Sequence, residues 1–521
     1  MSPARAAGGA STEDRVDPRR LVAFLAMIFG MFMAILDIQI VSASLVEIQA
    51  GLSASSDEIA YVQTSYLIAE VIMIPLSGFL ARILSTRILF TISAAGFTAA
   101  SVLCGMATSI EEMVVFRALQ GFIGGGMIPT TFAASFAMFP LSKRHIVMPM
   151  MGLVVPLAPT IGPTVGGLLT DAFSWHWLFY VNLVPGIGVT IAAWTLIDYD
   201  QPNWGLFRKT DWSGLFAMAG FLGTMEYVLE EGPSKDWFAD DTLCSVAAAS
   251  AATGLLFFWR AFRAEVPIVD LRAFANRNFA LGSLYSVVMG AGLFGLTYLY
   301  PLYLARIRGF TPLQIGETMF VTGAFMFLTA PIASRLVARM DPRAMLLFGF
   351  SLFSASTFLL TDITKDWDFR ELLVPQILRG CSLMFCMIPI NNLALGTLPV
   401  DRLKNAAGLY NLMRNLGGAL GLALINTVLN QRLDLHLVRL REQVGWGRGV
   451  AVETLAGMAA RFGDQGVDGN SIALKRLGEL VRREALVMSF ADIFLLLSLL
   501  VGAMIALIVI MERPRPAARR T

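Results

Sequence analysis

Long apolar runs alternate with short polar segments along nearly the whole chain. A helix needs about 20 apolar residues to cross the hydrocarbon core of a membrane. Fourteen runs have that length, so the pattern predicts an all-α integral membrane protein with 14 transmembrane helices. The expected spans are 21–45, 60–81, 88–108, 113–138, 147–170, 177–198, 213–230, 242–260, 279–303, 313–334, 344–361, 372–397, 407–429 and 486–511.

The chain also repeats itself at a nearly constant interval. Three pairs of similar positions lie 257, 256 and 259 residues apart, namely Ala81 with Ala338, Gly152 with Gly408, and Gly121 with Gly380. Parallel repeats of this kind are typical of transporters with a site near the bilayer midplane. We therefore expect an N-terminal six-helix bundle over 21–198, a C-terminal six-helix bundle over 279–511, and two inserted helices with a cytoplasmic linker over 199–278.

Composition agrees with a membrane protein. Hydrophobic residues make up 56% of the chain and charged residues 15%, against about 25% charged in a soluble domain. The first twenty residues are polar, so no removable signal peptide is expected. A net charge of +2 gives no indication of nucleic-acid binding.

Basic residues set the expected orientation. Short segments on the side of the two termini carry 23 Lys and Arg, and short loops on the other side carry 5. This bias predicts cytoplasmic tails at 1–20 and 512–521. The long polar segment 431–484, whose helical pattern is weak apart from its end, then lies on the outer side of the membrane.

Asp37 is the first candidate for chemistry, because it lies inside the first apolar run. An ionised group at this depth is costly and usually marks a proton, ion or substrate pathway. Asp37 lies ~24 Å from the cytoplasmic start of its span and Arg117 lies ~7 Å from the outer edge of the fourth, so the two side chains can share a level. The alternative is that Asp37 is a paired structural acid and that Arg117 only bonds helix ends.

Two further intramembrane acids are expected to lie at similar depths. Glu70 is ~15 Å into the second span, where it would bind protons or a cation, or else pair with Arg379 or Arg414 as a structural bridge. Glu226 lies in the first inserted span, and we expect it at the substrate cavity.

Polar and aromatic residues elsewhere predict a cavity for lipophilic compounds. The candidate lining residues are Gln39, Tyr61, Gln63, Tyr66, Glu226, Arg379, Asn391, Asn392, Tyr410, Asn411 and Arg414. The fifth span predicts a gate packed against a helix of the other half, because its small and kinking residues permit close approach. These are Pro159, Gly162, Pro163, Gly166 and Gly167. Enzyme, metal-site and cofactor motifs are not found in the sequence, so we expect no catalytic residues, metal or cofactor.

Several motifs resemble the major facilitator superfamily over roughly residues 20–511. They are LDIQIVSASL at 36–45, FRALQGFIGGG at 116–126, APTIGPTVGG at 158–167, SWHWLFYVNLVPG at 174–186 and GLYNLMRNLGGALG at 408–421. The chain is most similar to the fourteen-span drug:proton antiporters of the Emr type, which implies a bacterial inner-membrane protein with 431–484 in the periplasm. The resemblance implies multidrug efflux by alternating access, antibiotic resistance, proton coupling through Asp37, Arg117 and Glu70, and a tripartite pump. In such a pump a periplasmic membrane-fusion adaptor leads to an outer-membrane channel, and we expect 431–484 to dock the adaptor rather than only cover the outer mouth.

One motif departs from the family. The loop after the second span reads GFLARILSTR, with Arg82 where the superfamily usually has an acid. The usual charge latch between cytoplasmic helix ends is therefore not expected. Two other functions stay open at this point, namely a transporter of one specific metabolite, such as a fatty acid or siderophore, and a non-transporting membrane scaffold or sensor.

Overall fold

The computed structural model describes residues 17–55, 58–139, 144–265, 267–337, 339–399, 402–444, 448–462 and 469–511. The described residues form helices and short turns, and no strand occurs among them. The helices are α1 (Pro18–Ala43), α2 (Leu45–Leu52), α3 (Ala60–Leu84), α4 (Thr86–Met106), α5 (Ile110–Gly124), α6 (Met127–Met138), α7 (Arg144–Ala172), α8 (Trp177–Tyr180), α9 (Leu183–Leu196), α10 (Trp212–Glu231), α11 (Asp241–Arg263), α12 (Arg277–Tyr303), α13 (Pro312–Val337), α14 (Pro342–Phe358), α15 (Phe369–Leu395), α16 (Leu403–Gln443), α17 (Gly449–Phe462) and α18 (Gly469–Leu507).

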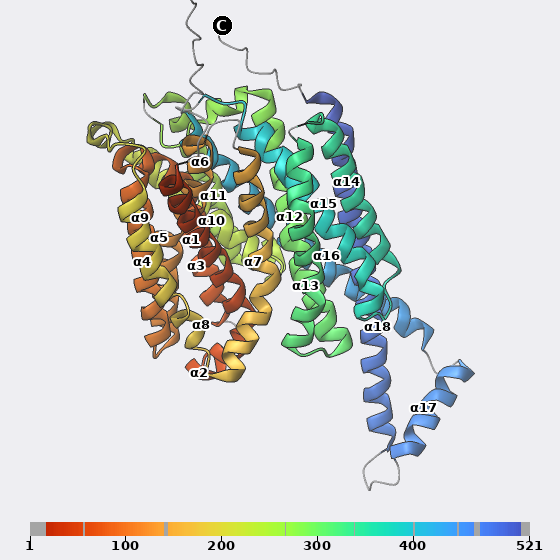
Figure 1. Ribbon diagram of the computed structural model, residues 1–521. Helices are drawn as coiled ribbons and strands as arrows, with labels where there is room; N and C mark the ends of the chain where they lie inside the picture. The colour runs from red at the N-terminus through yellow and green to blue at the C-terminus, as the bar shows by residue number, and fades with distance from the viewer. Residues whose placement is uncertain are drawn as a thin grey trace, which may run out of the picture.

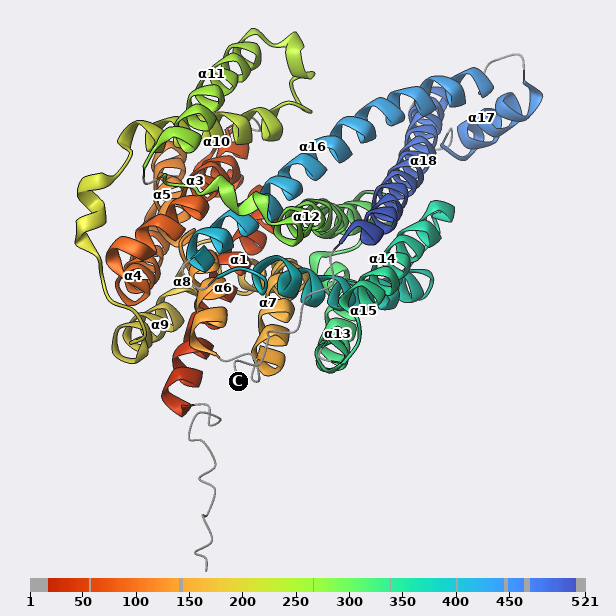
Figure 2. The same cartoon turned by 90° about the horizontal axis from the view of Figure 1, so that it is seen from above.

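Two groups of helices stand side by side (Figures 1 and 2). One group contains α1 to α9 and the other contains α12 to α16 with α18. The groups meet where α7 packs against α13 and where α16 packs against α3 and α6. The inserted helices α10 and α11 pack on each other, and α10 also contacts α3 and α16. The inserted pair thus covers one side of the junction between the groups.

Eleven helices of the described part are long and apolar enough to cross a membrane. The other three expected spans correspond to α5 with α6, to α7, and to α10. The expected span 113–138 is broken, because α5 ends at Gly124 and α6 begins at Met127. Glycine lowers helix propensity, and three consecutive glycines at 124–126 mark the break.

Capping groups fix several helix starts. Asp368 accepts a backbone N–H of the first turn of α15, and Glu371 bonds back to the Asp368 N–H as a capping box. The Ser109 side chain caps α5 by accepting the backbone N–H of Glu112, and the Asp240 side chain caps α11 by accepting that of Leu243. These caps begin helices where polar loops meet apolar runs. Between α11 and α12 the described residues include a short 3-10 turn at Leu271–Ala275.

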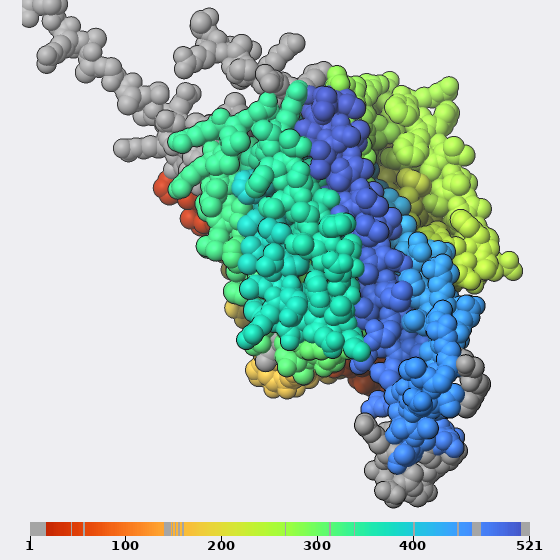
Figure 3. All heavy atoms as spheres, turned by 90° about the vertical axis from the view of Figure 1, so that its right-hand side faces the viewer, coloured from red at the N-terminus to blue at the C-terminus, as the bar shows by residue number. Residues whose placement is uncertain are grey.

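The polar segment 431–484 is far more helical than its weak pattern indicated. α16 continues to Gln443, α17 covers Gly449–Phe462, and α18 begins at Gly469. Together these ends project beyond the body of the molecule, on the side opposite the start of α1 and the end of α18 (Figures 1 and 3). His436 of α16 contacts Asp492 of α18 at 2.9 Å, and Arg432 contacts the same carboxylate at 3.5 Å. These contacts join the two long helices at the base of the projection.

Candidate functional site

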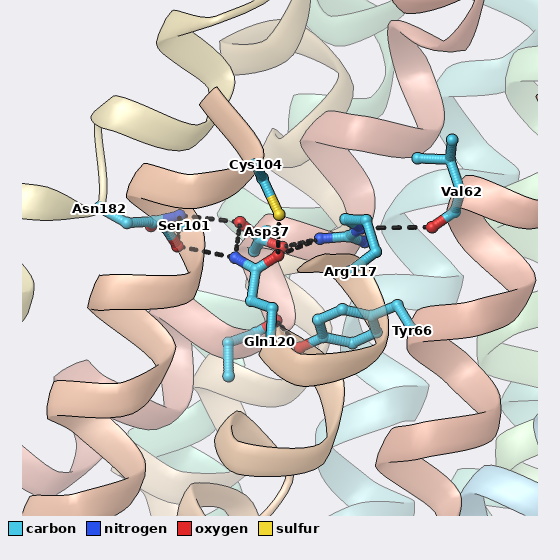
Figure 4. A network of polar contacts seen from close by, with 9 residues as sticks. Asp37, Val62, Tyr66, Ser101, Cys104, Arg117, Gln120 and Asn182 are labelled. Carbon is cyan, nitrogen blue, oxygen red and sulfur yellow. Dashed lines mark hydrogen bonds and ion pairs between the residues drawn. The ribbon is translucent and has the colours of Figure 1, made fainter. Parts of the chain in front are cut away.

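Asp37 lies near the C-terminal end of α1 and is completely buried. Its Oδ2 accepts a hydrogen bond from Arg117 Nη1 at 2.6 Å. Its Oδ1 accepts bonds from Gln120 Nε2 at 3.1 Å and from Asn182 Nδ2 at 2.8 Å. The carboxylate is therefore held by donors from α5 and from the start of α9, as Figure 4 shows.

Arg117 is also completely buried, and its guanidinium spans two helices. Its Nε donates to the carbonyl of Val62 on α3 at 3.3 Å, and Nη1 also donates to Gln120 Oε1 at 2.6 Å. The guanidinium lies over the ring of Tyr66, 4.2 Å from its centroid, which adds a cation–π attraction. Nη2 has no hydrogen-bond partner among the described residues.

A second layer of polar groups holds the two amides in place. Gln120 Nε2 donates to Ser101 Oγ at 2.7 Å, and Cys104 Sγ lies 3.6 Å from Gln120 Oε1. Asn182 Nδ2 also reaches Ser101 Oγ at 3.4 Å. The network therefore joins α1, α4, α5 and α9 around one carboxylate (Figure 4). Because removing one member of a buried ion pair leaves the other charge uncompensated, protonation of Asp37 would change the interactions of all four helices.

Glu70 of α3 is the next buried acid, 3% exposed, and its Oε1 has no hydrogen-bond partner among the described residues. The Cγ atom of Glu70 is 3.2 Å from the position that a Cβ on Gly125 would take, so Glu70 lies against the α5–α6 break. The described ion pairs do not join Glu70 to Arg379 or Arg414, although Arg414 is near enough to interact with its charge. Glu226 of α10 is also buried, and its Oε2 has no hydrogen-bond partner among the described residues.

The other expected cavity residues fall into separate groups. On the C-terminal side, Tyr410 donates to Asn391 Oδ1 at 2.6 Å, and Arg414 donates to the side chain of Asn411. Asn392 is partly buried. Arg379 is fully buried but forms a group of its own with α12.

The remaining N-terminal residues lie outside the Asp37 network. Tyr61 contacts Tyr227 of α10, and Lys235 donates to the Tyr227 hydroxyl at 3.2 Å. Gln63 is partly buried with Oε1 unpaired, whereas Gln39 lies against α7 at Gly162. The sequence alone did not indicate that these expected cavity residues lie apart from the Asp37–Arg117 ion pair.

The expected gate residues lie on one continuous helix, α7. Gly162 and Gly166 approach the backbone or Cβ atoms of Gln39 and Ile40 on α1, which is in the same half. Between these two glycines, Thr164 contacts α13 of the other half very closely. A Cβ added to Gly316 of α13 would lie 1.6 Å from Thr164 Oγ1. Pro163 and Gly167 are partly buried, and the side chain of Pro159 lies outside the described residues.

Residues 27–422 match the family model of the Major Facilitator Superfamily. The chain belongs to the major facilitator superfamily. It is 41% identical to the colistin resistance protein EmrB of Acinetobacter baumannii, over 94% of this chain and 96% of that protein. It is 28% identical to the multidrug export protein EmrB of Escherichia coli strain K12, over 81% and 82% of the two chains. The fold is similar to the crystal structure of the human organic anion transporter MFSD10, with a TM-score of 0.59, 12% identity, and coverage of 93% of this chain and 100% of that chain.

The superfamily's loop motif after the second span is degraded here, and the structure contains a different charge contact at the same end. Arg82 donates to the carbonyl of Pro267 at 3.5 Å. Asp200, which follows α9, accepts the backbone N–H of Thr86 at 2.9 Å and forms an ion pair with Lys404 of α16. The Lys404 carbonyl lies 2.7 Å from the position of a Cβ on Gly78 of α3. Asp200 therefore joins the two halves where the motif acid is absent.

Three residues of the Asp37 network had no role in the sequence analysis. Gln120 lies one helical turn after Arg117 in FRALQGF, and Asn182 lies in SWHWLFYVNLVPG, so both belong to motifs that were noticed. An amide one turn from a buried arginine is a signal that was available, since such residues share a helix face. Ser101 had no such signal, because only the packing of α4 on α5 places its hydroxyl beside Gln120.

Proposed function

We propose that this member of the superfamily is a proton-coupled antiporter that exports lipophilic compounds from the cytoplasm. The observation that carries the proposal is the buried Asp37–Arg117 ion pair in the N-terminal half of a transporter fold. The names of the relatives, a colistin resistance protein and a multidrug export protein, support export of drugs in particular. As a multi-pass membrane protein with buried polar groups along its spans, the chain fits alternating access better than a scaffold role.

The coupling rests on the Asp37 carboxylate, for which a proton and the Arg117 guanidinium compete. With Asp37 ionised, Arg117, Gln120 and Asn182 hold it and tie α1 to α5 and α9. A proton arriving from outside would remove the charge and weaken the pull on Arg117, which frees α1 to move relative to α5. Return of Asp37 to the ionised state on the cytoplasmic side would release the proton and restore the pair. Such an exchange requires that binding of the substrate and protonation of Asp37 exclude each other.

We also propose a membrane topology, which is supported by the apolar runs and the distribution of basic residues. The chain has fourteen spans, with both termini in the cytoplasm, six-helix bundles over 21–198 and 279–511, and an inserted pair between them. The projection of α16, α17 and α18 is then periplasmic. The proposal is supported by the position of the projection, which lies on the side of the molecule opposite the start of α1 (Figure 1).

Export is tested by following ethidium, a lipophilic cation, in inside-out vesicles energised by an imposed proton gradient. Vesicles that contain the protein should accumulate ethidium and lose it when a protonophore collapses the gradient. A panel of neutral and anionic compounds extends the assay to other substrates. Uptake in the opposite direction, or for one metabolite only, would favour the alternative of a specific metabolite transporter.

Glu70 gives a prediction about substrate charge. Glu70→Gln should lower transport of ethidium about tenfold and leave transport of neutral compounds nearly unchanged, because the unpaired carboxylate attracts a cation at low dielectric. The matched control is Glu111→Gln, which changes an exposed acid on α5. The measurement is the initial transport rate for cations and neutral compounds in the same vesicles. Equal losses for both classes would show that Glu70 supports the fold rather than the substrate.

We also propose that the projection binds a periplasmic adaptor of a tripartite pump, which leads to an outer-membrane channel. An apolar groove runs between the ends of its helices and is lined by Val444, Val452, Leu455, Leu474 and Leu477 among others. Leu474 is 58% exposed, and Val450 is 77% exposed. Apolar surface of this kind outside a membrane favours a helical partner.

The docking role predicts the effect of shortening the projection. Replacement of residues 440–477 by about ten Gly and Ser residues should spare membrane insertion and drug binding but abolish co-purification with the adaptor. The design retains His436 and Asp492, whose contact joins α16 to α18. A second variant, Leu474→Asp with Leu477→Asp, tests the groove without shortening the chain. If both variants keep full drug resistance and adaptor binding, the docking role is wrong and the projection only covers the outer mouth of the transporter.

A further inference from the structure

Arg379 of α15 is a buried cation that has no carboxylate partner in the part of the chain that the structure describes. It is 1% exposed, and only its Nη2 forms hydrogen bonds, to Thr297 Oγ1 at 3.0 Å and to the Leu293 carbonyl at 3.4 Å. The Nε and Nη1 atoms have no partner among the described residues. The Tyr300 ring, 5.3 Å from the guanidinium, provides the remaining attraction. Burial of an unpaired charge is expensive, so a guanidinium in this state requires an explanation.

Gln376 adds a second unpaired donor one turn earlier on the same helix. It is completely buried, and its Oε1 accepts the Thr322 hydroxyl at 3.0 Å. Its Nε2 has no partner among the described residues. Residues three apart share a helix face, so Gln376 and Arg379 present their free N–H groups on one side of α15.

The internal repeat shows what these donors lack. Gly121 of α5 approaches the Tyr66 backbone of α3, and Gly380 of α15 approaches the Thr322 backbone of α13, so the two glycines occupy equivalent positions. Before Gly121 the order is Arg117 then Gln120, and at the same 259-residue interval before Gly380 the order is Gln376 then Arg379. Both halves therefore place one arginine and one amide on the same face.

The carboxylate, by contrast, is present in only one half. In the N-terminal half Asp37 accepts from both Arg117 and Gln120. At intervals of 257–259 residues after Asp37 the chain has Phe294, Gly295 and Leu296, which cannot accept a side-chain hydrogen bond. The C-terminal half thus keeps the two donors and lacks the acid that they would bind.

We propose that Arg379 and Gln376 form an anion-binding subsite that takes the carboxylate of an amphipathic substrate when the bundle opens. The proposal rests on the proposed export function and specifies one substrate class for it. A guanidinium forms strong charge-assisted N–H bonds to a carboxylate, and the donors left free here are Nε and Nη1 of Arg379 and Nε2 of Gln376. The neighbouring Tyr300 ring supplies apolar surface for the rest of such a molecule. Cations bind instead at the acidic groups of the N-terminal half, where Glu70 is unpaired.

The test compares three amphiphiles with the same twelve-carbon chain on the purified full-length protein in lipid nanodiscs. They are dodecanoate, the neutral dodecanol and the cation dodecyltrimethylammonium. Arg379→Gln should weaken dodecanoate binding at least about tenfold and leave the other two within about twofold, because only the anion loses its charge-assisted bonds. Arg379→Lys should recover part of the affinity, since it restores the charge without the planar fork.

The controls separate the subsite from the fold and from export itself. Arg370→Gln removes an exposed cation from the same helix and should leave all three affinities unchanged. If Arg379→Gln does not fold, Gln376→Leu, which keeps the charge, should weaken dodecanoate selectively. Equal losses for the three amphiphiles, or wild-type protein that binds dodecanoate no better than dodecanol, would overturn the subsite. Binding in nanodiscs is measured without a proton gradient, so it does not depend on transport. Failure of the vesicle assay would count against the export function but would not affect the evidence for the anion subsite.

Discussion

Asp37→Asn abolishes proton-driven transport while the protein still inserts, folds and binds its substrate. Asparagine has nearly the volume of aspartate and can still accept bonds from Gln120 and Asn182 through its carbonyl oxygen. It cannot take up or release a proton, so the exchange that drives export is lost. We expect transport in energised vesicles to fall to the level of empty vesicles, a loss of at least about a hundredfold if the carboxylate carries the coupling.

The control for this variant is Glu47→Gln, which neutralises an exposed acid on α2 close to the same end of the bundle. It should transport at the wild-type rate. Substrate binding to Asp37→Asn, measured on the purified protein, distinguishes lost coupling from lost folding. Wild-type resistance in cells that produce Asp37→Asn would exclude Asp37 as the coupling group.

Arg117→Met destabilises the protein strongly, and a second substitution at Asp37 restores it. Removal of one partner of a buried ion pair usually costs about 3–5 kcal/mol, because the other charge stays buried without compensation. Here Arg117 also bonds the Val62 carbonyl and lies over Tyr66, so α3 loses contacts as well. The thermal midpoint of the Arg117→Met protein in detergent should be clearly below that of the wild type.

The double variant, Asp37→Asn with Arg117→Met, removes both charges and should recover much of the lost stability. It should still not transport, because no titratable group remains at the pair. Thermal unfolding of the four proteins completes a double-mutant cycle. Additive losses from the two single variants would show that the pair contributes no coupling energy to the fold.

Much of the fold follows from the apolar runs. Their length predicts transmembrane helices, and the polar residues between them predict where chain direction reverses. The break at Gly125 and the projection were not predictable in the same way. Gly125 could equally have packed inside a continuous helix, and the helical ends of α16 and α18 are stabilised by contacts such as His436 with Asp492 across long sequence distances.

The candidate site was predictable in part for a similar reason. A charged residue inside an apolar run is visible in the sequence, so Asp37 and Arg117 were identified, and depth alone put them at one level. The partners were less visible because Ser101, Gln120 and Asn182 are common neutral residues whose role depends on packing between helices. The replacement contact of Asp200 with Lys404 was hidden as well, because its residues lie far from the degraded loop motif in the sequence.

Proton release on substrate binding tests the coupling through Asp37 most directly. Purified wild-type protein in weakly buffered solution, without any gradient, should release protons when a transported compound such as ethidium is added, and a pH-sensitive dye records the change. The Asp37→Asn protein should bind the same compound and release none. Equal proton release from both proteins would contradict the account, because the exchanged proton would then come from another group.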